Sequence, residues 1–198
     1  RSLVGRHGLE RRAGDHADSH RLFDVDVFLP KGNGPFPAIL SRNPYESSSL
    51  KALEKGVWWA EREYVFVSAD CRGRYESEGE FYPHHPDIRD GYDTVEWIAH
   101  QPWNNGNVGT MGTSYMAWAQ SALATLNPPH LKAMFVNQGG SNAHTSSVRH
   151  MGAFEIRFLC WAMGVEGPKS KEAMKDPVIG KALAEVNMRK WLARTPLK

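Results

Sequence analysis

The sequence predicts an α/β fold, in which helices cover a mainly parallel sheet. Between residues 21 and 136, apolar runs of strand length alternate with helical patterns, an order typical of parallel sheets. Residues 64–69 (YVFVSA) form a continuously apolar run, as in a strand that is buried on both faces. The 198 residues are 41% hydrophobic and 23% charged, which is an ordinary globular composition.

The first elements lie within residues 21–40. Residues 21–30 (RLFDVDVFLP) place apolar side chains among polar ones, which predicts a strand with one solvated face. A turn rich in Gly and Pro leads to the apolar run 38–40, so we expect an initial hairpin. The elements that follow are a helix over 50–63, the strand over 64–69, a helix over 87–100, a strand over 107–111, a helix over 114–126 and a strand over 131–136.

The pattern changes after Gly140. Residues 141–198 show no strand candidate; the patterns over 143–163 and 170–192 predict helices, separated at Gly167-Pro168. At the other end, residues 1–20 are polar and predict a flexible N-terminal arm. We therefore expect an arm over 1–20, a sheet-bearing part over 21–140 and a helical part over 141–198.

Charge and composition exclude several classes of function. A net charge of +2 gives no electrostatic case for a nucleic-acid partner. No apolar run approaches the ~20 residues that span a bilayer, so no membrane partner is expected. No secretory-signal pattern follows Arg1, which favours a cytoplasmic location. Cys71 and Cys160 lie outside CxxC pairs and are expected to be small buried side chains.

The segment that carries chemistry is residues 104–124 (NNGNVGTMGTSYMAWAQSALA). A short strand runs into Gly112-Thr113-Ser114-Tyr115-Met116, and a helical sequence begins at once. A nucleophile elbow needs this arrangement, because its serine sits on a tight strand-to-helix turn with its hydroxyl exposed. The backbone N–H of the next residue, Tyr115, is then placed to bind a developing oxyanion.

Other interpretations of this segment are possible. Ser114 can instead be the N-cap of an ordinary helix. The glycines at 106, 109 and 112 match neither G-x-G-x-x-G nor a P-loop, so nucleotide binding is not expected. Adjacent histidines such as His84 and His85 rarely bind one ion, and no Cys or acid pattern completes a site; we expect neither a metal nor a cofactor.

Several blocks of this sequence resemble the α/β-hydrolases of the cocaine esterase and X-Pro dipeptidyl-peptidase type (CocE/NonD-like acyl hydrolases). In the family's order they are DVDVFLP (24–30), GPFPAILSRNPY (34–45), VFVSADCRGRYESEGEF (65–81), DGYDTVEWIAHQPWNNGNVGTMGTSY (90–115) and PPHLKAM (128–134). The resemblance covers about residues 22–165. Where the family has Gly, this chain has Ala117, also small, so close helix packing is expected to survive.

The resemblance implies roles for individual residues. Ser114 matches the nucleophile that forms an acyl-enzyme with a small-molecule ester or amide. Tyr45, in Asn43-Pro44-Tyr45, matches the tyrosine whose hydroxyl completes the oxyanion hole with the N–H of Tyr115. Arg72 falls in a loop near the active site, where a bidentate contact would give it an architectural role.

The resemblance also divides the chain. Residues 21–140 would be the N-terminal part of the hydrolase domain, and residues 141–198 a partial helical cap that roofs the acyl pocket. Trp161 and Phe154 would then line this pocket as substrate-binding residues. Alternatively, Phe154, Phe158 and Trp161 are the buried side of an amphipathic helix.

The residues present do not complete a catalytic triad. This fold supplies Ser, then an acid, then His along the chain. The acids after Ser114 begin at Glu155, whereas the last histidine is His150. We favour the N-terminal part of a longer hydrolase; the alternatives are a second chain that supplies acid and His, and a non-catalytic binding or scaffold remnant with Ser114 as a helix cap. The isolated chain is expected to be a very poor esterase and to self-associate.

Overall fold

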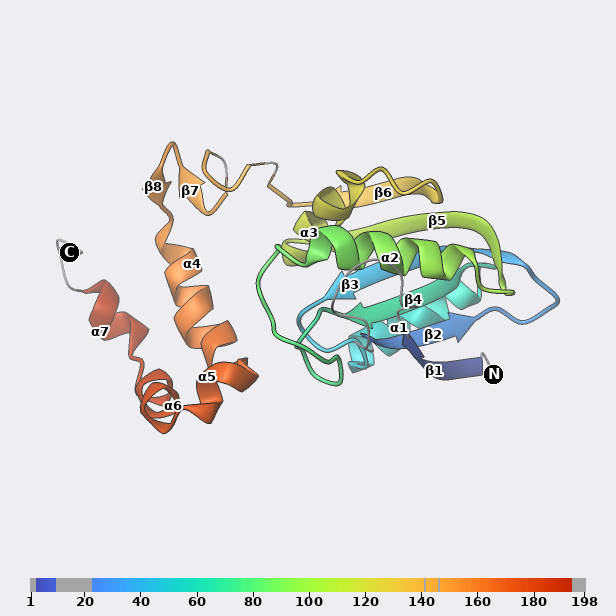
Figure 1. The fold of residues 1–198 in the computed structure, drawn as a ribbon. Helices are drawn as coiled ribbons and strands as arrows, with labels where there is room; N and C mark the ends of the chain where they lie inside the picture. The colour runs from blue at the N-terminus through green and yellow to red at the C-terminus, as the bar shows by residue number, and fades with distance from the viewer. Residues whose placement is uncertain (1–2, 10–22, 141, 146, 194–198) are drawn as a thin grey trace. The chain divides into compact units, whose positions relative to one another are not determined.

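A six-stranded sheet is the centre of the first of two units, Arg1–Gly140 and Ser141–Lys198 (Figure 1). The computed structural model describes residues 3–9, 23–140, 142–145 and 147–193. The strands of the sheet are β1 (Leu3–Leu9), β2 (Phe23–Leu29), β3 (Phe36–Asn43), β4 (Val65–Asp70), β5 (Asn104–Thr113) and β6 (Leu131–Asn137).

The spatial order of the strands is β1-β2-β4-β3-β5-β6. Strands β3, β4, β5 and β6 are parallel, whereas β1 and β2 run antiparallel to their neighbours. The carboxyl ends of four strands therefore meet at one edge of the sheet, where open α/β sheets bind their ligands.

Helices cover both faces of this sheet (Figure 1). They are α1 (Leu50–Ala60), α2 (Asp87–Ala99) and α3 (Tyr115–Ala124). Along β4, Val65 and Val67 join the core that includes residues of α2 and α3, while Phe66 packs in a second core with Ala60 of α1. Gly56 allows α1 to approach the sheet, because a Cβ there would lie 2.3 Å from the ring of Phe28. The predicted mainly parallel α/β architecture is therefore confirmed.

The initial part of the sheet differs from the prediction. No hairpin joins β2 to β3, because β4 lies between them. The predicted solvated face of β2 is also wrong: Asp26 is only 4% exposed, and Phe28 on the same face packs in a core with Ala60 of α1. Leu3–Leu9, predicted within a flexible arm, forms β1 by pairing with β2; pairing context of this kind outweighs weak local pattern. Residues 10–20 of the predicted arm lie outside the described residues.

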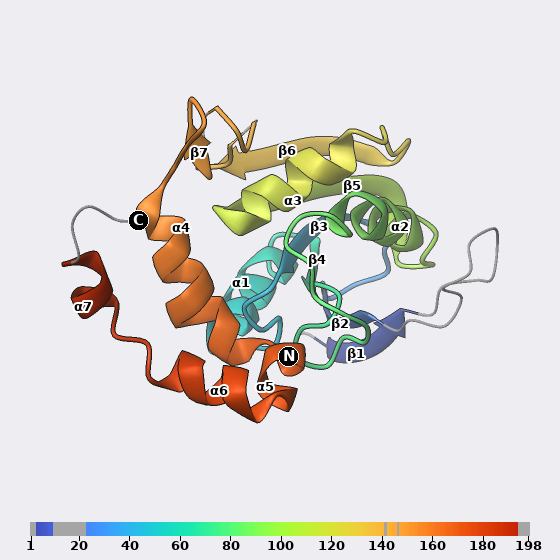
Figure 2. The ribbon, with the colours of Figure 1, turned by 60° about the vertical axis from the view of Figure 1, so that its left-hand side comes forward.

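The second unit holds a two-stranded hairpin and a series of short helices (Figure 2). The strands are β7 (Arg149–His150) and β8 (Ala153–Phe154). The helices are α4 (Ile156–Trp161), a π-helical turn (Ala162–Glu166), a 3-10 turn (Gly167–Lys169), α5 (Lys171–Lys175), α6 (Pro177–Ala184) and α7 (Met188–Leu192).

The prediction of two long helices without strands is wrong for this unit. The side chains of Ser170, Asp176 and Asn187 each accept a hydrogen bond from the first turn of the helix that follows. Such caps stabilise new helix starts, so the segment 170–192 divides into three helices. None of the helices in the described ranges is long and apolar enough to cross a membrane.

Candidate active site

Ser114 lies between the end of β5 and the start of α3, in a strained turn. Its backbone angles are φ 61° and ψ −118°, a region that a residue with a Cβ rarely adopts. The Ser114 N–H donates to the carbonyl of Asn137 at the end of β6, at 3.0 Å, and its carbonyl accepts from the N–H groups of Ala117 and Trp118. The neighbouring strand and the first turn of α3 thus hold the turn at both ends.

The helix-cap interpretation of Ser114 does not fit this geometry. Ser114 occupies the N-cap position of α3, yet its side chain makes no capping hydrogen bond. In α1, by contrast, Ser49 has an extended backbone and its hydroxyl accepts from the N–H of Ala52 at 3.4 Å, as N-caps normally do. The Ser114 side chain is exposed, as a nucleophile elbow requires.

Small residues make this tight turn possible. A Cβ at Gly112 would lie 2.2 Å from the Cβ of Met116. The Met116 side chain therefore leaves no room for a side chain at position 112. Ala117 is fully buried, and a Cβ at Gly139 would lie 2.7 Å from its methyl group. Close packing at Ala117 is therefore retained, because Gly139 leaves room for the methyl group.

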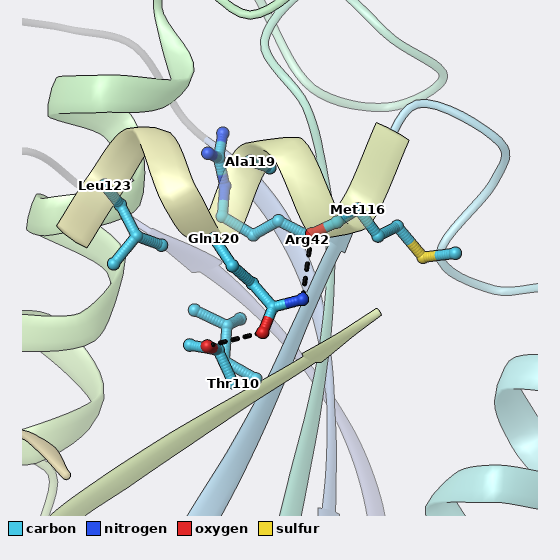
Figure 3. Close-up of a pocket in the computed structure, with 7 residues that line it drawn as sticks. Arg42, Thr110, Met116, Ala119, Gln120 and Leu123 are labelled. Carbon is cyan, nitrogen blue, oxygen red and sulfur yellow. Dashed lines mark hydrogen bonds between the residues drawn. The ribbon is translucent and has the colours of Figure 1, made fainter. Parts of the chain in front are cut away.

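Behind the elbow, Gln120 connects α3 to the sheet (Figure 3). Its Oε1 accepts from Thr110 Oγ1 at 2.9 Å, and its Nε2 donates to the carbonyls of Met116 and Phe135 at 3.1 and 3.2 Å. The pocket beside it has room for about one water molecule. This pocket is part of the helix–sheet packing and is too small for a substrate.

Tyr45 lies at the same sheet edge, in the loop that follows β3. The side chain of Asn43 accepts from the Tyr45 N–H at 2.8 Å, and Arg74 Nε donates to the Pro44 carbonyl at 3.0 Å. The Tyr45 and Tyr115 rings meet edge to face, with centroids 6.4 Å apart. Of the three residues predicted to form the catalytic site, Tyr45 and Tyr115 are thus in ring contact, and Ser114 directly precedes Tyr115 in the chain.

Arg72, in the loop after β4, has the predicted architectural role. Its guanidinium makes two hydrogen bonds to the carboxylate of Asp90 in α2, one of them 2.8 Å from Nε to Oδ2. Gly73 has φ +73°, and a Cβ there would lie 2.3 Å from the backbone nitrogen of Phe81. Asp90 lies in the acidic first turn of α2, and its carboxylate there binds Arg72.

A buried polar network that the sequence analysis missed lies under Tyr115. Its Oη donates to Asp87 Oδ2 at 2.7 Å and accepts from the N–H of His84 at 2.9 Å. Arg42 Nη1 donates to Asp87 Oδ1 at 3.0 Å. Burial, aided by Asp87, raises the pKa of Tyr115 far above its usual value, so the phenol stays protonated. The acidic first turn of α2 was the one local signal for this network.

Two further titratable groups lie near the site. Burial lowers the pKa of His84, whose ring stacks on Tyr115 with centroids 4.2 Å apart. Burial also raises the pKa of Asp70 to about 7, although the Ser47 N–H, 2.7 Å from Asp70 Oδ1, opposes the shift. Asp24 and Asp26 add to the increase at Asp70.

The predicted pocket residues Phe154 and Trp161 belong to the second unit. Phe154 lies on β8, not on a helix, and is 49% exposed with the Arg149 guanidinium 5.6 Å from its ring centre. Trp161 ends α4. The interpretation of both as one buried helix face is therefore wrong for Phe154, and their pocket role stays a prediction. In the described ranges, no three His, Cys, Asp or Glu side chains gather as metal ligands.

The strand order, the helices on both faces and the elbow after β5 define an α/β-hydrolase-like fold. Solved hydrolases share it. A CocE/NonD family hydrolase from Staphylococcus aureus superposes with a TM-score of 0.62 at 29% identity, over 72% of this chain and 28% of that one. An α-amino acid ester hydrolase gives a TM-score of 0.68 at 25% identity, over 82% of this chain and 30% of that one.

Sequence comparison identifies the family. The model of the X-Pro dipeptidyl-peptidase (S15) family matches residues 18–198, and the chain belongs to that family. Cocaine esterase from Rhodococcus sp. (strain MB1 Bresler) is 41% identical over 114 residues, 56% of this chain. A putative serine esterase from Mycobacterium bovis is 34% identical over 133 residues. The chain spans about a fifth of the length of these curated relatives.

Proposed function

We propose that this chain supplies the nucleophile and the oxyanion hole of a serine hydrolase that cleaves ester or amide bonds. The backbone of Ser114 is the observation that carries the proposal. A strained, exposed serine between a parallel strand and a helix has no use as a cap, whereas a nucleophile elbow requires it. The relatives named as esterases and as an α-amino acid ester hydrolase support an acyl substrate.

In the proposed reaction, Ser114 Oγ attacks the substrate carbonyl carbon and loses its proton to a general base. The carbonyl oxygen becomes an oxyanion, which accepts hydrogen bonds from the Tyr115 N–H and the Tyr45 hydroxyl. Collapse of this intermediate expels the alcohol or amine, protonated by the same base, and leaves an acyl-serine. Water then releases the acid and regenerates the hydroxyl of Ser114.

On this proposal, the general base comes from outside these 198 residues. No His follows an acid after Ser114, and the acid-then-His order is the one this fold uses. We propose that a continuation of the same polypeptide supplies both groups; a second chain is the alternative source. A serine with only an oxyanion hole keeps little activity, so the 198-residue polypeptide alone should be a very poor esterase.

Labelling with a fluorophosphonate tests the proposal. The natural protein should react, and a tryptic map should place the label on Ser114. Ser114→Ala should abolish labelling, whereas Ser121→Ala, a serine of α3 bonded to the Ala117 carbonyl, should leave it intact. Equal labelling of the Ser114→Ala variant would refute the nucleophile. Labelling of the 198-residue polypeptide at the natural protein's rate would refute the need for an external base.

A further inference from the structure

Asp87 is a buried carboxylate that joins three elements of the site. It is 2% exposed and is the first residue of α2, where the positive end of the helix favours its charge. Oδ1 accepts from Arg42 Nη1 at 3.0 Å and lies 3.5 Å from the Cys71 sulfur, while Oδ2 accepts from Tyr115 Oη at 2.7 Å. The positive charge of Arg42 offsets the cost of burying the Asp87 carboxylate. The hydrogen bond from Tyr115 is therefore an interaction beyond the one that neutralises this charge.

The Tyr115 side chain is held at its hydroxyl and along its ring. The hydroxyl donates to Asp87 and accepts from the His84 N–H. The ring stacks on His84 and makes a T-shaped contact with the Tyr45 ring. The Tyr115 side chain therefore contacts Tyr45, whose hydroxyl is one proposed oxyanion donor. The backbone N–H of Tyr115 itself is the other.

The turn at Ser114 needs support of this kind. A positive φ at a residue with a Cβ is unfavourable, and it persists only where the surroundings hold it. The bond from the Ser114 N–H to Asn137 holds the side of the turn that faces β6. The bond from Tyr115 to Asp87 holds the next residue of the chain.

We propose that Asp87 is a positioning residue for the oxyanion hole. By holding the Tyr115 hydroxyl, its carboxylate fixes the direction of the Tyr115 N–H and the surface on which the Tyr45 ring rests. The inference rests on the proposed function, because it assigns Asp87 to the hydrolytic site. It requires no contact between Asp87 and the substrate.

Asp90 provides a matched control for a purely structural role. It has the same side chain, lies one turn further along α2, is fully buried and also binds an arginine, Arg72. Loss of either carboxylate leaves a buried guanidinium short of its partner and should lower stability. Asp87 hydrogen-bonds Tyr115, so its loss should disturb the oxyanion hole more than the loss of Asp90.

The test compares Asp87→Asn, Tyr115→Phe and Asp90→Asn in the full-length natural protein. Readouts are kcat and KM for a p-nitrophenyl ester, inhibition by a phenylboronate and thermal unfolding. Asp87→Asn and Tyr115→Phe should each lower kcat about 10- to 100-fold, less than the ~10²- to 10³-fold loss from deleting a donor outright. They should weaken boronate binding by a similar factor and leave KM nearly unchanged.

The double variant Asp87→Asn/Tyr115→Phe should have a kcat no lower than that of the less active single variant, because both substitutions break the same hydrogen bond. Asp90→Asn should keep kcat and boronate affinity. The proposal is overturned if Asp90→Asn lowers kcat as much as Asp87→Asn, or if Tyr115→Phe keeps full boronate affinity. Tyr115→Phe retains the ion pair between Asp87 and Arg42, so this variant tests the proposal if Asp87→Asn fails to fold. If Ser114 in the parent protein forms no acyl-enzyme, the proposed function has failed instead.

Discussion

Tyr45 lies directly after Pro44, in a loop held by Asn43 and Arg74, and its ring touches Tyr115. If its hydroxyl is an oxyanion donor, Tyr45→Phe should lower kcat about 10²- to 10³-fold with little change in stability, because the ring contact remains. Tyr82→Phe, at a tyrosine that is 63% exposed, is the control. Steady-state kinetics that show equal kcat for both variants would remove Tyr45 from the site.

Asp70 makes stability depend on pH. Its folded pKa of about 7 lies above the ordinary value of 3.8, so folding favours the protonated form. This contribution is fully present below about pH 4, declines as the pH rises towards 7 and is absent above 7. Asp70→Asn cannot ionise, and its amide oxygen still accepts from the Ser47 N–H.

The Asp70→Asn variant should therefore gain stability over the parent as the pH rises, by an amount on the order of 4 kcal/mol between pH 4 and pH 8. Urea unfolding at both pH values measures the difference. A gap that stays constant with pH would show that folding leaves the pKa of Asp70 unshifted.

At the residue scale, the sequence predicted the exposed part of the site better than the buried part. Ser114 and Tyr115 sit in a local motif, and Tyr45 follows a recognisable Pro-Tyr pair. The partners of Asp87 lie 45 residues before it and 28 residues after it. The parallel pairing of β3, β4 and β5 brings them together, so the sequence shows locally the acidic first turn of α2 but not the partners of Asp87.

At the element scale, the packing of α3 against the loop after β6 depends on two small residues in contact, Ala117 and Gly139. Gly139→Ala should place a methyl group 2.7 Å from the Ala117 Cβ and 3.0 Å from Val136 Cγ1, which costs about 1–3 kcal/mol. Adding Ala117→Gly should recover part of this loss, since it removes the closer contact. Chemical unfolding of Gly139→Ala, Ala117→Gly and the double variant measures the loss of stability and its recovery. A double variant less stable than Gly139→Ala alone would contradict a steric clash between residues 117 and 139.

The positions of two helices beside the site were predictable. The helix expected over 87–100 is α2, Asp87–Ala99, and the one expected over 114–126 is α3, Tyr115–Ala124. The sequence failed where pairing or capping decides. Strand β2 pairs with β1 and β4 in place of β3, and the cap at Asp176 ends one helical run and starts another.

For the whole molecule, β6 is an edge of the sheet and carries exposed apolar side chains. Phe135 is 64% exposed, and Met134 and Val136 are more than 40% exposed. Unpaired edges with apolar faces associate, so the 198-residue polypeptide should dimerise or aggregate at micromolar concentration. Phe135→Lys should reduce this association, whereas Leu50→Lys on α1, at a leucine that is 78% exposed, should not. Size-exclusion chromatography with light scattering measures it; a sharp monomer peak from the parent polypeptide would contradict the prediction.

The central claim is that Ser114 becomes acylated during turnover. The most direct measurement is acid quenching of the natural protein during turnover of p-nitrophenyl acetate, followed by peptide mapping by mass spectrometry. Our account predicts one acetyl group on the peptide that contains Ser114, and none in the Ser114→Ala variant. Ester hydrolysis with the acetyl group on a different residue, or undiminished hydrolysis by the Ser114→Ala variant, would contradict it.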